Sequence, residues 1–244
     1  MNMSKTDEFY GMVWKRHLPK IEEQIQFLDK LIGKNNIQGK AVLDAGCGTG
    51  VASIAFKKLG AKKVVGIDLS EDSLKTAKIL AQKANTDVIF LKKDLLNLKL
   101  KDKFDIILSF GVLHHTGNTK KAFENLMEYL ERDGKFYVAL YWKTNLTFLH
   151  QSARRLLRML PESTWIPIAK FISIFMIRKK KVRRGFDGYG EMLDWFFVPH
   201  RDHHKPKQIK KWFEEYGMRS ELVIDQTGRY KSTSNFIMVG YYEK

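Results

Sequence analysis

The chain has 244 residues, of which 44% are hydrophobic, and this is enough to bury a full core in one domain that carries an insertion. Its single cysteine, Cys47, excludes an intrachain disulfide, and residues 1–17 contain no apolar run of the length that a signal peptide needs, so we expect a cytoplasmic protein. The formal net charge of +16 suits an anionic partner such as nucleic acid, a membrane surface or an acidic substrate, although a solvated lysine-rich surface would give the same total.

The first predicted element is an amphipathic segment over residues 8–32, which we expect to form one or two helices within an N-terminal helical segment, 1–39. Its apolar residues recur at near-helical spacing, at Trp14, Ile21, Ile25, Leu28 and Leu31.

Strand and helix patterns then alternate along the chain. Short apolar runs predict five strands, at 40–46, 62–68, 87–94, 104–110 and 134–142. Between them, amphipathic patterns predict helices at 51–60, 70–85 and 120–130. Ser70 is the candidate N-cap of the second of these helices. Strands separated by helices in this order favour a parallel sheet that is covered on both faces, the doubly wound α/β class.

The turn after the first predicted strand reads VLDAGCGTG, residues 42–50, and has a glycine at every second position. It is not a dinucleotide fingerprint, because the position three after Gly48 is Val51. It is not a phosphate-binding P-loop either, because it contains no lysine. An acid, Asp44, precedes the turn, and a second acid, Asp68, ends the second strand, where it could accept both hydroxyls of a ribose. The pattern favours a nucleoside ligand with a cationic amino group.

Four sequences in order, VLDAGCGTG, GIDLS, KKDLLNL and FDIILSFGVLHHTGN, resemble the motifs of the class I S-adenosylmethionine-dependent methyltransferases. The resemblance covers residues 40–142 and is to the small-molecule group that includes the ubiquinone-type (type 11) enzymes. It implies a Rossmann-like sheet of seven strands, whose last two, at 219–225 and 235–243, form an antiparallel hairpin after a helix at 207–217. Residues 40–144 and 206–244 would form the cofactor domain.

The same resemblance implies S-adenosyl-L-methionine as the cofactor and assigns residues to its parts. Asp44 and the three glycines would line the methionine side, Asp68 would hold the ribose hydroxyls, and Asp94 would accept from the adenine amino group. The full implied set is Asp44, Gly46, Gly48, Gly50, Asp68, Leu69, Asp94, Leu95 and Ser109.

A hydroxyl acceptor must lose its proton during methylation, so the site needs a base or an acidic acceptor. His114 and His115 follow the fourth strand directly, at the expected mouth of the site, and histidine titrates in the right range. The sequence does not choose between them. Members of the family often carry histidines here that serve loop packing, and that alternative stays open.

A segment of different character, residues 145–205, is expected to form a cap insertion that determines the choice of acceptor. Its part from 145 to 184 has ten Lys or Arg residues and one acid, Glu162, which leaves +9 of the total +16. The apolar run 165–177 is too short to cross a bilayer but, beside RKKKVRR, has the composition of an interfacial helix on anionic lipid. A cap packed on the domain and a basic rim for a soluble anionic substrate are the alternatives.

The last part of the cap combines aromatic and polar residues. Tyr189, Asp194 and Trp195 are candidate substrate contacts in a lid. The group His200, Asp202, His203 and His204 has residue types that bind metals, but adjacent histidines on an extended chain face opposite ways, so we expect a solvated loop and no metal.

The sequence therefore predicts methyl transfer to a small-molecule or lipid-like acceptor, with a hydroxyl favoured. The alternatives are N- or C-methylation of a soluble anionic molecule, and a cofactor-binding membrane adaptor without catalysis. Nucleic acid is disfavoured, because the chain has SFGV where enzymes that methylate a base amine carry an Asn-Pro-Pro-Tyr type sequence, and no recognised RNA module is present.

Overall fold

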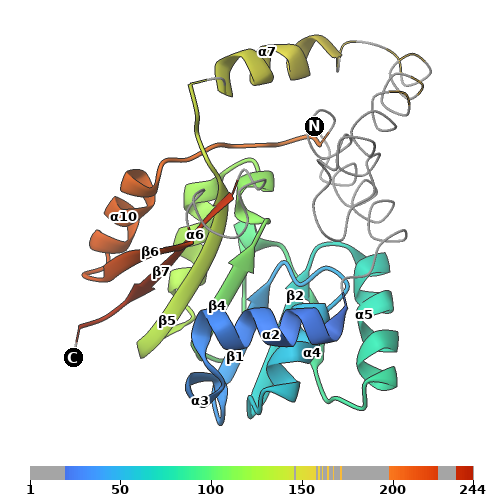
Figure 1. Cartoon of the computed structure of the whole chain (residues 1–244), viewed down its shortest axis with the longest axis vertical. Coiled ribbons are helices and arrows are strands. Elements are labelled where there is room, and N and C mark those ends of the chain that lie inside the picture. The colour runs from blue at the N-terminus through green and yellow to red at the C-terminus, as the bar shows by residue number, and fades with distance from the viewer. Residues whose placement is uncertain are drawn as a thin grey trace.

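A seven-stranded sheet forms the centre of the molecule, with the strand order β3-β2-β1-β4-β5-β7-β6 (Figure 1). The computed structural model describes residues 20–145, 147–157, 198–224 and 235–243, and single residues at 159, 161, 164, 167 and 171. The strands are β1 Ala41–Ala45, β2 Lys63–Asp68, β3 Ile89–Lys92, β4 Phe104–Phe110, β5 Leu130–Tyr141, β6 Arg219–Ile224 and β7 Asn235–Tyr241. The first five are parallel, and β7 pairs antiparallel with both β5 and β6. The predicted Rossmann-like class with a closing antiparallel hairpin is confirmed.

Helices cover both faces of this sheet. The helices are α2 Ile21–Ile32, α3 Lys34–Ile37, α4 Val51–Lys58, α5 Glu71–Lys83, α6 Thr119–Met127, α7 Thr147–Leu157 and α10 Pro206–Glu214, with 3-10 turns η1 Leu95–Asn97 and η2 Leu113–His115. One core cluster joins one face of the sheet to α6 and α10 through Phe123 and Phe213. The other face packs against α2 and α4 through Leu28 and Phe56. Alternate residues of the central strands enter the two clusters, as the two-residue repeat of a strand requires.

The predicted start of α5 is confirmed in detail. The Ser70 side chain accepts a hydrogen bond from the backbone N–H of Ser73 at 3.2 Å, which satisfies one of the free amides of the first turn. The N-terminal prediction is tested only from residue 20 on. There α2 buries Leu28 and Ile32, whereas Trp14 lies outside the described residues.

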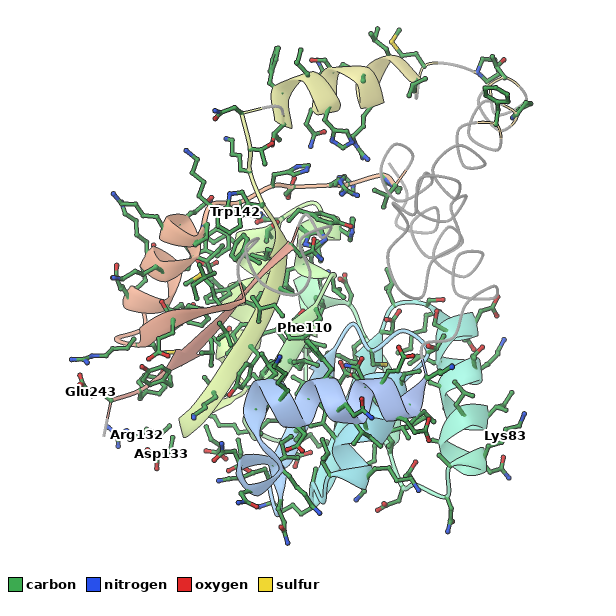
Figure 2. All side chains as sticks on the ribbon, in the orientation of Figure 1. Lys83, Phe110, Arg132, Asp133, Trp142 and Glu243 are labelled. Carbon is green, nitrogen blue, oxygen red and sulfur yellow. The ribbon has the colours of Figure 1, made fainter. Side chains whose placement is uncertain are left out.

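The predicted fifth strand began four residues too late. β5 begins at Leu130, and α6 ends at Met127 rather than at Leu130. Leu130 pairs with Phe104 before the register shifts, and the Phe104 N–H donates to the Tyr129 carbonyl at 2.9 Å. Burial of Leu130 against the sheet therefore outweighs the helical pattern that runs through it in the sequence. Figure 2 shows Trp142 at one end of this long strand and Arg132 and Asp133 at the other.

After β5 the chain leaves the sheet and returns. Figure 1 shows α7 beyond the carboxyl end of β5, away from the helices that cover the sheet. The chain comes back through residues 198–204, which we call the return segment. An isolated parallel bridge joins Trp142, just after β5, to His204 at the end of this segment. The return segment thus lies at the same end of β5 as the turn that leads to α7.

Candidate functional site

The glycine turn between β1 and α4 has a backbone that only glycine accepts easily. Gly46, Gly48 and Gly50 have φ angles of 83°, 51° and 76°. A Cβ on Gly50 would lie 2.7 Å from the Phe90 ring, and one on Gly46 would overlap the Val112 side chain. The turn is therefore packed tightly against β3 and against the segment that follows β4.

Asp68 ties this turn to the end of β2. One of its carboxylate oxygens accepts from the Gly48 N–H and the other from the Ser70 N–H, both at 2.8 Å. The side chain is half-buried, and each carboxylate oxygen can accept a further hydrogen bond. Asp68 can therefore accept from a ribose diol without giving up its contacts with the turn.

Asp44, the last but one residue of β1, is buried behind the turn. Its carboxylate accepts from the Ser53 hydroxyl at 2.6 Å, in the first turn of α4. The pKa of Asp44 is raised to about 6, mainly by burial; the hydrogen bond from Ser53 opposes the rise, and the negative charge of Asp68 contributes to it. The negative charges of Asp44 and Asp68 repel each other across one turn. A cationic ligand bound at this turn would reduce the repulsion and stabilise both carboxylates.

This pKa predicts a pH dependence for the unfolding free energy. The folded protein holds the Asp44 proton more tightly than the unfolded chain, whose carboxyl has the ordinary value of 3.8, so the contribution of this group to stability falls as the pH rises from about 4 to about 6. In Asp44→Asn, stability relative to the cofactor-free wild type should rise by about 2 to 3 kcal/mol between pH 4 and pH 7. Urea unfolding at several pH values measures this, and a difference that does not change with pH would contradict the assignment.

The other residues implied for the cofactor lie at the carboxyl ends of β2, β3 and β4. The Ser109 hydroxyl donates to the Ala45 carbonyl at 3.0 Å and is fully buried, so it supports the start of the glycine turn from β4. The Asp94 carboxylate accepts from the Leu96 N–H at 2.9 Å and from the Asn97 side chain at 3.0 Å, and so caps η1. Leu95 is buried in the core, and Leu69 is half-buried beside Asp68.

The paired histidines form η2, three residues after β4. We expected them at the mouth of the site, but the structure buries both: His114 is 0% exposed and His115 6%. The His114 ring lies 4.0 Å from the Tyr141 ring, between centroids, and 4.2 Å from the His115 ring. The His115 Nδ1 is 2.6 Å from the carbonyl oxygen of His200. Because a carbonyl can only accept, Nδ1 carries the proton, and the acceptor nitrogen of the neutral ring is Nε2.

The return segment is not the solvated loop that the sequence predicted. His204 is buried, with its Nε2 3.1 Å from the Thr119 hydroxyl, which in turn donates to Asp202 at 2.9 Å. The backbone N–H of His204 donates to the Tyr141 carbonyl at 2.8 Å. These bonds carry the segment across the end of β5 and beside η2, so it forms one wall of the region around the histidines.

His203 and His204 face opposite ways, as predicted for an extended chain. His203 turns toward α7, where its Nδ1 lies 3.1 Å from the Gln151 side chain. Burial and, to a smaller extent, the charge of Arg201 lower the pKa of His203 to about 3, so this ring is neutral at physiological pH. Among the described residues, no group of three or more His, Cys, Asp or Glu side chains could hold a metal ion.

Sequence reasoning missed two residues of this region. Tyr141 ends β5 and lies between the His114 ring and the Arg201 guanidinium, which stands 3.6 Å from the centre of the tyrosine ring. Arg201 is only 4% exposed. A single arginine in a basic segment gives no sequence signal of burial, because the same residue type usually lies on the surface. Of the predicted substrate contacts, Tyr189, Asp194 and Trp195 lie outside the described residues.

A family model described as a methyltransferase domain matches residues 37–217, about three quarters of the chain. The chain belongs to this methyltransferase family. Solved structures of magnesium protoporphyrin IX methyltransferase from Synechocystis, one with bound SAH and one with bound SAM, share the fold. The first covers 100% of this chain and 89% of its own, with a TM-score of 0.57 and 20% identity.

Curated relatives of the methyltransferase match over shorter spans. A ribosomal protein L11 methyltransferase of Thermotoga maritima is 38% identical over 37% of this chain and 33% of its own length. Ubiquinone biosynthesis O-methyltransferases of Pelagibacter ubique and Glaesserella parasuis are 32% and 31% identical, over 57% and 53% of this chain and 59% and 58% of theirs. The chain thus spans between a third and three fifths of the length of these relatives.

The cofactor of the methyltransferase is S-adenosylmethionine, and the turn at the end of β1 fits it. A nucleoside with a cationic amino acid tail needs a close approach to the backbone, an acceptor for the ribose and negative charge nearby. The glycine turn, Asp68 and Asp44 supply these three features within one edge of the sheet.

Proposed function

We propose that the methyltransferase transfers the methyl group of S-adenosylmethionine to a hydroxyl oxygen of a small-molecule or lipid-like acceptor. The observation that carries this proposal is the orientation of His115 by the His200 carbonyl, 2.6 Å from its Nδ1. That contact leaves Nε2 as the basic nitrogen of the ring. Val112, three residues earlier, packs on Gly46, so the histidine stands one short turn from the glycine turn of the cofactor site.

Methyl transfer requires the protein to position the acceptor oxygen and to provide a proton acceptor. Bound S-adenosylmethionine supplies an electrophilic methyl group on its sulfonium. Transfer then depends on an oxygen held in line with that group and on removal of the hydroxyl proton. In the proposal, His115 Nε2 takes this proton, and the buried surroundings of η2, closed by Tyr141 and the return segment, exclude water from the proton acceptor.

The relatives support an oxygen acceptor without identifying one. Two of those named above are ubiquinone biosynthesis O-methyltransferases, and they match more of this chain than the L11 methyltransferase does. N- or C-methylation and a cofactor-binding adaptor without turnover are the competing functions. Incubation with S-adenosylmethionine and a panel of phenols, quinols and amines, read by mass, separates them: methylated phenol or quinol supports the proposal, methylated amine alone replaces it, and cofactor binding with no product favours the adaptor.

We further propose that the methyltransferase is cytoplasmic and meets anionic membranes through its basic segment 165–184, as its composition predicts. Most of that segment lies outside the described residues, but two of its members, Pro167 and Phe171, are described and exposed, Phe171 to 76%. No helix among the described residues is long and apolar enough to span a bilayer. In this proposal the contact with lipid takes place at the membrane surface, where each cation contributes about 1 kcal/mol.

Charge reversal tests the membrane proposal. Changing Lys179, Lys180 and Lys181 to glutamate should abolish co-sedimentation with anionic vesicles at low salt. The three changes make the charge of the segment more negative by six units and so remove its attraction to the anionic surface. The matched control reverses Lys99, Lys101 and Lys103, which are exposed on the sheet domain. Equal loss in both variants would indicate an unspecific effect of net charge, and no sedimentation of the wild type would favour a soluble acceptor.

A further inference from the structure

Helix α7 presents three large apolar side chains to the solvent and turns Arg154 toward the protein. Phe148, Leu149 and Leu156 are 77%, 64% and 68% exposed, whereas Arg154 is 3% exposed. The three apolar residues follow helical spacing, so they share one side of the helix, which we call the outer face of α7. A helix that only covers a globular domain has the opposite arrangement.

Hydrogen bonds to the return segment hold α7 in this orientation. The Arg154 guanidinium donates to the Val198 carbonyl at 2.6 Å. One turn earlier, the Gln151 amide donates to the Arg201 carbonyl at 2.7 Å. Rotation of the helix to bury its leucines would break both bonds and expose the carbonyls that accept them. The outward direction of the apolar residues is thus built into the packing.

The charge beside the outer face and in the sequence that follows it indicates what covers it. Arg155 is exposed beside Leu156, and residues 158–184, the sequence that continues from α7, add eight basic residues and one acid. Two copies of this face brought together would set like charges against each other, which disfavours a dimer. Apolar residues flanked by cations match the boundary between the headgroups and the acyl chains of an anionic bilayer. We infer that the outer face of α7 inserts into an anionic membrane surface.

The inference deepens the proposed function and rests on it, because it names the element that would bring the site to a lipid-soluble acceptor. α7 lies beyond the carboxyl end of β5 (Figure 1), and its inner face binds the same return segment whose His200 carbonyl orients His115. The membrane contact and the proposed base are therefore separated by one extended segment. An acceptor that leaves the bilayer at α7 would have only this segment to pass before it reaches the site.

The test replaces the apolar residues and leaves the charges. Phe148→Ser, Leu149→Ser and Leu156→Ser, combined in one variant, should weaken partitioning onto vesicles of phosphatidylglycerol and phosphatidylcholine by about tenfold or more. The matched control, Ile79→Ser with Ile89→Ser, removes apolar side chains that are 54% and 48% exposed on α5 and β3, and should change partitioning by less than about twofold. As a second measurement, Phe148→Trp should gain fluorescence quenching by brominated lipids relative to the wild type.

Each outcome decides the inference. Unchanged partitioning of the triple serine variant, or no added quenching in Phe148→Trp, overturns it, as does a wild-type dimer in sedimentation velocity that the serine variant converts to a monomer. Methylation of a water-soluble phenol and the calorimetric affinity for S-adenosylmethionine should stay at the wild-type level in the serine variant, because no cofactor contact is changed. If the wild type methylates no hydroxyl compound, the proposed function fails, and the vesicle result still stands by itself.

Discussion

Replacement of Asp68 by alanine should weaken the binding of S-adenosylmethionine by about 1.5 to 3 kcal/mol, the range for lost charge-assisted hydrogen bonds. In affinity this is a loss of about 10-fold to 150-fold. Two effects add. The ribose would lose its acceptor, and the Gly48 N–H would lose the carboxylate that holds the glycine turn against β2 at 2.8 Å. Calorimetric titration of the purified protein measures the change.

Two companion variants test the role of the charge and the specificity of the effect. Asp68→Asn keeps one acceptor oxygen without the charge, so its affinity should lie between those of the wild type and the alanine variant. Asp72→Ala removes an exposed carboxylate from the first turn of α5, four residues further on, and should leave the affinity unchanged. The same affinity in Asp68→Ala as in the wild type would show that the cofactor does not use this carboxylate.

The second large effect is expected at His115. His115→Asn should lower turnover by about 10²-fold or more with little change in the affinity for S-adenosylmethionine, because the base acts on the acceptor and not on the donor. The pH dependence of turnover should lose its lower limb in this variant, since that limb reports the titration of the base in the complex. Steady-state rates with the acceptor found in the panel, at several pH values, provide the measurement.

Two control variants bear on the choice of His115. His200→Ala removes a side chain but keeps the carbonyl that accepts from Nδ1, so turnover should remain close to that of the wild type. His114→Asn disturbs a ring that packs on Tyr141, and we expect a loss of stability larger than its loss of turnover. Full activity in both His114→Asn and His115→Asn would retire the idea of a histidine base and leave the acidity of the acceptor as the explanation.

The element order and the cofactor turn could be predicted from the sequence, because both depend on short spacings along the chain. Short apolar runs identified the first five strands, the family resemblance implied the closing hairpin, and the Ser70 cap defined the start of α5. Glycines at every second position, with Asp44 before them and Asp68 at the next strand end, meet at one edge because parallel strands end together. These features require no knowledge of contacts between distant residues.

The surroundings of the histidines and the orientation of α7 were decided by tertiary structure alone. His115 and His200 are 85 positions apart, yet their contact determines the tautomer of the proposed base. The histidine-rich return segment has the composition of a solvated loop, but backbone bonds to Tyr141 and His114 draw it onto the sheet. The sequence of α7 likewise indicates two faces but does not show which one packs on the protein. That orientation depends on the distant carbonyls to which Gln151 and Arg154 donate. Local periodicity identifies an element and its faces, whereas only long-range contacts determine what each face touches.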